Sequence, residues 1–259
     1  MIRFCSLGSG SSGNGTLVEA SSAGRTTRVL VDCGFSLREL AVRLARLDLV
    51  PDDLDAVFIT HEHGDHVGCA ARLSARHGVP LWLSRGTWRA MGEPVLPHPP
   101  HFARDGEAVT VGDLQFTPFT VPHDAHEPLQ ITFTDGVSRL GILTDVGTST
   151  PHLLAHLQRC EALLLEFNHD PAMLAGSRYP YPVKRRIGGP LGHLSNETAA
   201  SILAACLHDG LRHVAAGHLS QENNTPELVR AALATVTGAS AGEFVVADAA
   251  NGFGWLSLR

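Results

Sequence analysis

The sequence predicts an α/β protein of layered mixed sheets covered by helices. Strand-like apolar segments alternate with amphipathic helical segments along the whole chain, which favours helices packed on sheets. The 259 residues include 44% hydrophobic side chains, enough for a sizeable core. No low-complexity linker or break in composition divides the chain, so we expect a single domain over residues 1–259.

The expected strands are short apolar runs, several of which end at a polar residue. They cover residues 2–8, 16–20, 28–34, 54–60, 80–84, 114–121, 129–135, 139–145, 162–168, 212–217 and 244–248. Apolar residues at helical spacing predict helices over 36–48, 66–78, 151–160, 196–210 and 226–238. Pro226 suits the first turn of the last helix, and Gly210 and Gly238 are expected to end the helices that precede them.

Composition favours a cytoplasmic protein. No apolar stretch approaches the length needed to cross a bilayer, and the first residues enter a strand pattern without a signal peptide. The five cysteines are scattered without a C-x-x-C pair, which is typical of reduced thiols. The net charge of −6 weighs against a protein that coats nucleic acid non-specifically.

The stretch 59-ITHEHGDHVGC-69 concentrates metal-ligand side chains at the end of a strand. The apolar run before it is typical of a strand buried on both faces, so charges at its end must be paired or bind a metal. Ligand-type side chains stand at His61, His63, Asp65 and His66. They can converge if the chain turns sharply, and Gly64 is expected to supply the turn. Four ligands exceed the three that one catalytic zinc takes, which indicates two ions.

Single ligand-type residues end three further apolar strands, at His123, Asp145 and His218. One strand-end histidine is more often a hydrogen-bonded structural residue. Four such endings in one chain predict a shared metal site. Imidazole and carboxylate ligands without cysteine favour zinc, with manganese and iron as alternatives.

On these residues the chain resembles the metallo-β-lactamase superfamily of dinuclear hydrolases, nearly from end to end. It is most similar to the YycJ/WalJ branch, related to ribonuclease Z-like phosphodiesterases. The shared motifs are 8-GSGSSGNGT-16, 61-HEHGDH-66, 121-VPHDAHEP-128, 144-TDVG-147, 166-EFNHD-170, 178-RYPYPVKRRIGGPLGHLSNE-197 and 217-GHLSQENN-224. The resemblance implies a four-layer αββα sandwich of two mixed sheets with helices outside.

The resemblance also implies how the ligands divide between two divalent ions. One ion would be held by His61, His63 and His123, and the other by Asp65, His66 and His218, with Asp145 bridging them. The implied activity is 5′-to-3′ DNA exonuclease, with Asp65, Asp145 and His193 as catalytic residues. A hydroxide bridging the two ions would attack the phosphodiester, and the ions would stabilise both attacking and leaving oxygens. No obligate protein partner is expected.

Two GHLS segments raise the question of which histidine binds metal. His218 follows a strand and is the expected ligand, whereas His193 follows a loop and precedes a helix that Ser195 can cap. By resemblance to ribonuclease Z-like enzymes, His193 would contact the scissile phosphate or protonate the leaving oxygen. The alternative is a structural histidine bonded to backbone.

Other expected site residues rest on weaker patterns. Ser12 and Asn14 lie in a Gly-Ser loop that could cradle phosphate or form a plain hairpin. Lys184 and Arg185, followed by Arg186, form a basic run that binds nucleic acid or is a solvated face. The residues expected to orient the ligands are Glu166 and His169, with Asp124, His126 and Asp170 as similar candidates.

Two other function classes stay open at this stage. A small-molecule hydrolase of the same fold, acting on a thioester, lactone or cyclic phosphodiester, fits the negative net charge slightly better. A metal-binding regulatory module without turnover is the third class, and the complete ligand set and His193 argue against it.

Overall fold

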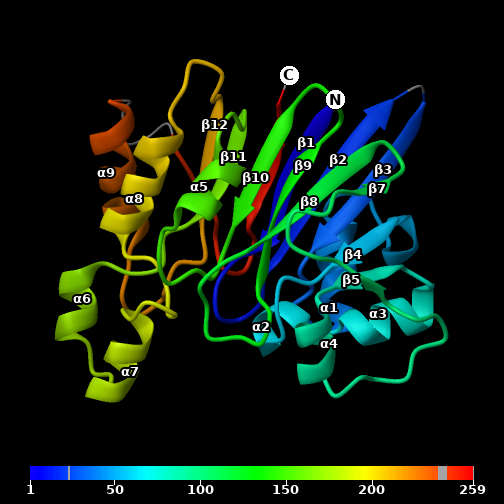
Figure 1. The fold of residues 1–259 in the computed structure, drawn as a ribbon, viewed down its shortest axis with the longest axis horizontal. Coiled ribbons are helices and arrows are strands. Elements are labelled where there is room, and N and C mark those ends of the chain that lie inside the picture. The colour runs from blue at the N-terminus through cyan, green and yellow to red at the C-terminus, as the bar shows by residue number, and fades with distance from the viewer. Residues whose placement is uncertain (23, 239–243, 259) are drawn as a thin grey trace.

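The computed structural model describes residues 1–22, 24–238 and 244–258. Within these residues the chain forms two seven-stranded mixed sheets that pack face to face, with helices on the outer faces (Figure 1). The predicted αββα architecture is confirmed.

The first sheet has the order β14-β1-β2-β3-β4-β5-β6. Its strands are β1 (Ile2–Gly8), β2 (Gly15–Ser22), β3 (Arg25–Val31), β4 (Ala56–Phe58), β5 (Leu81–Leu83), β6 (His101–Phe102) and β14 (Phe253–Ser257). Strands β14, β1, β2 and β3 pair antiparallel, and β3 to β6 pair parallel. The carboxyl ends of β3 and β4 therefore lie at the same edge.

The second sheet has the order β13-β12-β11-β10-β9-β8-β7. Its strands are β7 (Val109–Val111), β8 (Leu114–Thr120), β9 (Leu129–Thr134), β10 (Arg139–Leu143), β11 (Ala162–Glu166), β12 (His213–Gly217) and β13 (Val245–Val246). Strand β9 is antiparallel to both β8 and β10, and β10 to β13 are parallel. Strands β8, β10, β11 and β12 thus end at one common edge.

Helices cover both outer faces and one edge. They are α1 (Leu37–Ala45), α2 (Gly64–Val67), α3 (Ala70–His77), α4 (Arg85–Ala90), α5 (Pro151–Leu157), α6 (Pro171–Gly176), α7 (Tyr181–Ile187), α8 (Asn196–Cys206) and α9 (Pro226–Thr237), with a 3₁₀ turn, η1 (Pro51–Asp53). Helices α1 and α3 pack on the first sheet, and α5, α8 and α9 pack on the second. Figure 1 places α6 and α7 together, projecting beyond the end of the second sheet.

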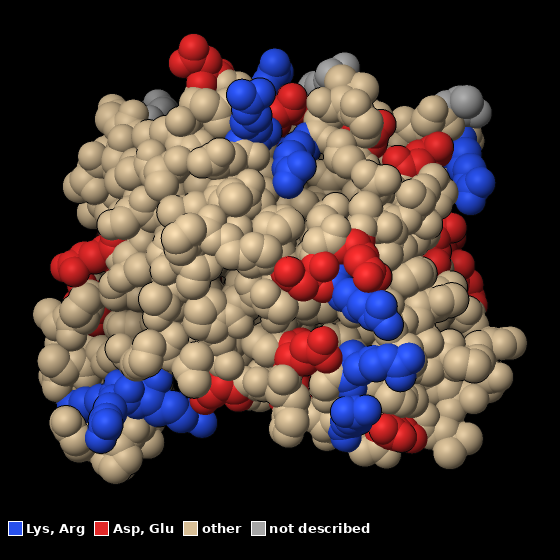
Figure 2. Space-filling view, viewed as in Figure 1, with Lys and Arg blue, Asp and Glu red and all other residues tan. Residues whose placement is uncertain are grey.

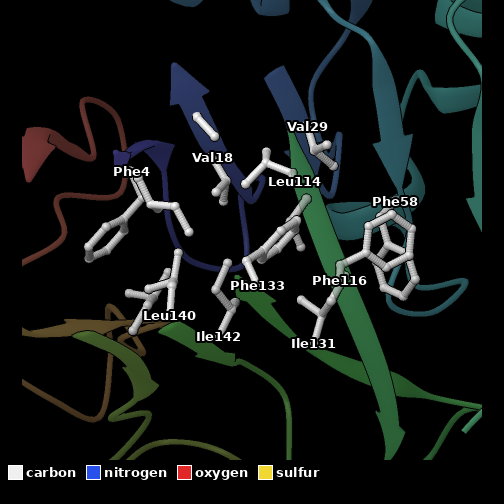
Figure 3. Packing of buried hydrophobic residues seen from close by; sticks show 14 of the residues in the cluster. Phe4, Val18, Val29, Phe58, Leu114, Phe116, Ile131, Phe133, Leu140 and Ile142 are labelled. Atoms are coloured by element: carbon white, nitrogen blue, oxygen red, sulfur yellow. The ribbon is translucent and has the colours of Figure 1, made fainter. Parts of the chain in front are cut away.

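The main core lies between the two sheets. Figure 3 shows Val18 and Val29 of the first sheet facing Leu114, Phe116 and Phe133 of the second. Because side chains alternate across a strand, β11 buries one face in this core and its other face under the helices. This double burial explains why the strand sequences read as continuous apolar runs.

The structure corrects three details of the sequence analysis. The helix expected over 66–78 is wrong as a single element, because the chain breaks at Gly68, where φ is 28°, and α3 begins after Cys69. Gly64 does not supply a turn, since it is the first residue of α2. The expected stop at Gly210 is also wrong, because α8 ends at Cys206 and the next residue is extended.

Other expectations about the helix ends are confirmed. Pro226 begins α9, and Gly238 ends it with a left-handed φ of 69°. Several elements were not expected from the sequence, namely β6, β7, β14, η1, α4, α6 and α7. Most of them are too short to show a periodic pattern. Among the described residues, none of the helices combines the length and apolar character needed to span a membrane.

Candidate metal centre

The polar residues that follow the strands meet at one edge of the sandwich. From the first sheet, β3 leads to Asp32, and β4 leads to the loop and short helix α2 that carry the histidine-rich motif. From the second sheet, β8, β10 and β12 lead to His123, Asp145 and His218. The centre is therefore assembled from both sheets.

The structure brings all seven expected metal ligands together. Two groups of ligand atoms within 4.8 Å of one another hold these seven residues: His61, His63, His123 and Asp145, and Asp65, His66, Asp145 and His218. The described residues contain two further groups of this kind, Asp145, Glu166, His193 and His218 in the same centre, and Asp105, His152 and His156 elsewhere. Asp145 belongs to both groups of expected ligands, as a bridging carboxylate would. Its Oδ2 atom lies 2.6 Å from His66 Nε2 and 3.3 Å from His61 Nε2.

The donor set fits divalent cations. His61 and His66 are fully buried, and His218 and Asp145 nearly so. The Nε2 atoms of His61 and His218 make no hydrogen bond within the described part of the chain. Buried polar atoms without partners are costly, and a cation would satisfy them. Nitrogen and carboxylate oxygen donors suit zinc, manganese or iron.

Hydrogen bonds on the side away from the centre hold three of the histidine rings in place, those of His61, His66 and His123. His66 Nδ1 lies 2.7 Å from Asp32 Oδ2, and His61 Nδ1 lies 3.0 Å from Thr60 Oγ1. His123 Nδ1 donates to the Gly192 carbonyl at 3.0 Å. Because each Nδ1 is engaged, each Nε2 faces the centre, which is the arrangement that fixes a metal-binding tautomer.

Asp32 and Thr60 are site residues that sequence reasoning missed. Asp32 is 2% exposed and accepts hydrogen bonds from both the backbone and the hydroxyl of Thr60. A signal for it existed, because Asp32 follows the apolar strand β3 as Asp145 follows β10. It lies within the strand expected over 28–34, whose sheet pairing in fact ends at Val31.

Glu166 lies beneath the centre as expected of an orienting residue. Its Oε1 lies 2.7 Å from His193 Nδ1 and 3.3 Å from His218 Nδ1, and it is fully buried. Its Oε2 accepts a hydrogen bond from the Val146 backbone. His169 lies apart from the ligands and lines a neighbouring cavity.

His193 lines the cleft above the centre and belongs to a third group, with Asp145, Glu166 and His218, outside the two groups of expected ligands. Its ring centroid is 5.4 Å from those of His123 and His218. Its Nδ1 lies 2.7 Å from Glu166 Oε1 and 3.3 Å from Asp145 Oδ1. The ring is held by carboxylates. This differs from the alternative considered for His193, a structural histidine bonded to the backbone.

The charges of the centre shift the pKa values of the histidines in two directions. Burial lowers the pKa of His61 to about 4. Burial also acts to lower the pKa of His66, but the Asp145 and Asp32 carboxylates raise it to about 10. The pKa of His193 is raised to about 10, because Glu166 and Asp145 outweigh its burial. Without cations, protonated histidines thus balance the negative charge of the carboxylates in the centre.

The carboxylates shift in the opposite sense. Burial acts to raise the pKa of Glu166, but His193 and His218 lower it to about 2. The pKa of Asp145 is held well below its usual range, because His218 and His66 outweigh the effect of burial. Both carboxylates therefore stay charged near neutral pH, as ligands and positioning groups for cations must be.

A cleft of about 330 Å³ opens over the centre. Its lining includes Asp65, Asp124, Asp145, Arg186, His193 and His218. Ser11 lines it, whereas the expected Ser12 is exposed outside it. Asn14 is buried, and its side-chain amide donates to the Asp65 carbonyl at 3.2 Å, so it holds the Asp65 loop from below.

The basic run divides around α7. Arg186 lines the cleft, while Lys184 and Arg185 line a second cavity on the other side of the helix. Lys184 Nζ donates to the Ala175 carbonyl at 2.6 Å. Of the remaining candidates, Asp124 lines the cleft, and His126 pairs with Glu62 at the surface.

This fold and this centre define a metal-dependent hydrolase. Residues 27–212 match the beta-lactamase superfamily domain, and the chain belongs to that superfamily.

Two bacterial relatives cover most of the chain. Exodeoxyribonuclease WalJ of Streptococcus pneumoniae serotype 2 is 34% identical over 232 residues, covering 88% of this chain and 85% of the relative. Exodeoxyribonuclease YycJ of Bacillus anthracis is 32% identical over 238 residues, covering 91% of this chain and 89% of the relative. The crystal structure of the metallo-beta-lactamase fold protein YhfI from Bacillus subtilis superimposes with a TM-score of 0.73 at 18% identity, covering 99% of this chain and 100% of that one. The last match shows the common fold.

Proposed function

We propose that this protein is a metal-dependent DNA exonuclease that hydrolyses phosphodiester bonds. The observation that carries the proposal is the convergence of two ligand groups on Asp145, beneath a cleft that also presents His193 and Arg186. The relatives named exodeoxyribonucleases support DNA as the substrate, because they align with about nine-tenths of the chain. A cytoplasmic location and the 5′-to-3′ direction are further parts of the proposal.

The proposal includes two divalent ions, with zinc favoured over manganese and iron. His61, His63 and His123 would hold one ion, and Asp65, His66 and His218 the other, with Asp145 between them. Such ions, when bound, activate water near neutral pH and neutralise charge on a phosphodiester. The carboxylate and carbonyl partners of the ligand rings would keep the donor atoms in position.

His193 is proposed as the general acid. Its Nδ1 proton is held by the Glu166 carboxylate, which also favours the charged imidazolium. The Nε2 proton can then pass to the oxygen that leaves the phosphorus. Arg186, on the α7 side of the cleft, is suited to bind a phosphate of the same strand.

The substrate class can be tested by presenting three substrates to metal-loaded protein. These are 5′-phosphorylated duplex DNA labelled at either end, bis-p-nitrophenyl phosphate and a glutathione thioester. We expect nucleotides to be released progressively from the 5′ ends of the DNA, with slower turnover of the nitrophenyl diester. Rapid thioester hydrolysis without DNA cleavage would instead identify a small-molecule hydrolase. No turnover of any substrate would favour a regulatory metal-binding module.

A further inference from the structure

A second cavity, of about 750 Å³, lies on the opposite side of α7 from the metal cleft. Its lining includes His169, Leu174, Tyr179, Tyr181, Lys184 and Arg185. Both tyrosines of the chain are among these residues. Tyr179 is half-buried, and Tyr181 is 75% exposed, so an aromatic ring stands open to solvent at this cavity.

The second cavity adjoins the metal cleft through two short chain segments. Along α7, Arg185 lines the cavity, and the next residue, Arg186, lines the cleft. Before α8, His193 lines the cleft and Ser195 lines the cavity. Two residues of chain span at most about 7 Å, so the two spaces are separated by little more than the width of these segments.

His169 supplies an unsatisfied polar group in the wall of the second cavity. The residue is only 4% exposed, and its Nδ1 atom is itself buried, with no hydrogen-bond partner within the described residues. A buried nitrogen of this kind is unusual in a folded protein unless a ligand or water completes it. What the cavity presents to a ligand is therefore the aromatic face of its tyrosines, with His169 behind the wall.

The cavity is also basic at its rim. Figure 2 shows lysine and arginine side chains gathered where Figure 1 places α6 and α7, and this helix pair carries Lys184, Arg185 and Arg186. Arg185 is exposed and forms no ion pair within the described part of the chain. The surface therefore combines cationic and aromatic groups on a protein whose net charge is −6.

We propose that this second cavity binds a nucleobase of the DNA strand whose scissile phosphate lies in the metal cleft. Tyr181 would stack on the base, and Arg185 would pair with the adjoining phosphate. Stacking on an aromatic ring tolerates any base, as an exonuclease that advances along a strand requires. This inference rests on the proposed function, and it names a contact outside the catalytic centre. An apolar peptide would use the tyrosines but would leave Arg185 unmatched.

The test compares metal-loaded wild type with Tyr181→Ala and Tyr181→Phe. The probe is a single-stranded phosphorothioate oligonucleotide, which reports binding without cleavage. We expect Tyr181→Ala to bind about 5- to 150-fold more weakly, from the usual energy of stacking one base. Tyr181→Phe, which keeps the ring, should bind as wild type does. The control is Val137→Ala, which truncates an exposed apolar residue outside the second cavity. It should bind the oligonucleotide as wild type does.

An abasic series identifies the nucleotide that occupies the cavity. Removing the base at one position of the oligonucleotide should weaken wild-type binding, and the same removal should add little in Tyr181→Ala. Arg185→Ala should weaken binding of every oligonucleotide and reduce the salt slope by about one. Hydrolysis of bis-p-nitrophenyl phosphate should stay unchanged in all these variants, because this small diester reaches only the cleft.

Three outcomes would overturn the inference. Wild-type affinity of Tyr181→Ala for the oligonucleotide would exclude the stacking contact. Equal losses in Tyr181→Ala and Tyr181→Phe, or a matching loss on the nitrophenyl diester, would show a structural effect instead. If base removal weakened binding by Tyr181→Ala as much as binding by wild type at every position, the bases would not contact Tyr181. Failure of wild type to cleave DNA, with the diester still hydrolysed, would instead reject the exonuclease proposal.

Discussion

At the scale of single residues, the centre depends on an uncommon backbone conformation. Asp32, Asp145 and His218 have φ angles of 61°, 49° and 56°, in the left-handed region that side chains other than glycine seldom adopt. Each stands directly after its strand has ended, where the chain turns into the centre. Such conformations cost about 1–3 kcal/mol each and persist where the surrounding structure fixes them. The centre is thus partly pre-organised by strained backbone.

The first prediction concerns metal stoichiometry. We expect two ions per chain, since the two ligand groups share only Asp145. His61→Ala should weaken one site and His66→Ala the other, because each removes a nitrogen donor from a different group. Elemental analysis after dialysis measures both effects. A single tightly bound ion in wild type, with no further loss in His66→Ala, would contradict the two-ion centre.

The second prediction separates the two GHLS histidines. His193→Ala should keep both metals and lose on the order of 10²–10⁴-fold in rate on DNA, whose sugar alkoxide leaves poorly without a proton. The loss on bis-p-nitrophenyl phosphate should be much smaller, because nitrophenolate leaves readily. His218→Ala should lose a metal, and its rate of hydrolysis should fall on both substrates. Equal losses for His193→Ala on the two substrates would leave phosphate binding as its role.

The third prediction concerns pH. The pKa of His66 is raised to about 10 and that of His218 well above its usual value, so both carry protons in the metal-free centre at neutral pH. Metal binding must displace these protons, about two per chain, and affinity should rise with pH until they are lost. Calorimetry in two buffers of different ionisation enthalpy measures the proton release. Metal uptake without proton release would show that the rings are already neutral.

The same shifts determine how pH acts on the metal-free protein. A raised folded-state pKa at His66 contributes stability that is complete below pH 6.5, the ordinary value, and is lost as pH rises through about 10. The metal-free protein should therefore lose this contribution at alkaline pH. The metal-loaded protein should not, because His66 is already neutral there.

At the scale of secondary-structure elements, close packing between loops places the ligands. The segment after β3 lies against α2, which carries Asp65. There the Gly34 backbone donates to the Asn14 carbonyl, and the Asn14 backbone donates to the Asp65 carbonyl. A Cβ atom at Gly34 would overlap the Asp65 backbone. The glycine is needed for this close approach, and its position relative to Asp65 is set by β3 and β4 pairing side by side.

The fourth prediction follows from this packing. Gly34→Ala should displace α2 and weaken the second metal site, which contains Asp65 and His66 of this helix. Gly64→Ala is the matched control, because nothing lies within 4 Å of a Cβ at that position. Metal content and thermal unfolding of the two variants measure the effect. Equal metal content in both would show that α2 can move without cost to the centre.

At the scale of the whole molecule, the centre joins the two sheets. The histidine-rich motif comes from the first sheet, and His123, Asp145 and His218 come from the second. The core between the sheets therefore sets the distance between the two halves of the centre. Phe116 is fully buried in this core, with its ring centroid 5.5 Å from that of Phe58 in the opposite sheet.

The fifth prediction tests this coupling. Phe116→Ala should destabilise the fold by about 3–5 kcal/mol through the lost burial and the cavity left behind. The melting temperature should fall by roughly 6–20 °C. Added metal should restore part of the loss, because ions that bind only the folded state stabilise it by mass action. A melting temperature insensitive to metal would show that the centre does not hold the sheets together.

The sequence by itself determined the layered fold and the set of expected ligands that the structure brings together. Continuous apolar runs predicted the buried strands. The polar residue after each run, such as Asp145 or His218, was therefore expected where a strand ends. Such patterns are local, because burial repeats along the chain with the period of the element. The same pattern, a polar residue after an apolar run, also marks Asp32 after β3 as a residue of the centre.

Only the tertiary structure decided which side chains surround the cleft. Helix α7 has no buried residue, so its sequence carries no periodic pattern to show which side faces the metals. Arg186 lines the cleft while Lys184 and Arg185 face the second cavity, and Ser11 replaces the expected Ser12. Which residues line each space depends on how loops from distant parts of the chain pack together. Sequence periodicity indicates which face of an element is buried, but not which other element it contacts.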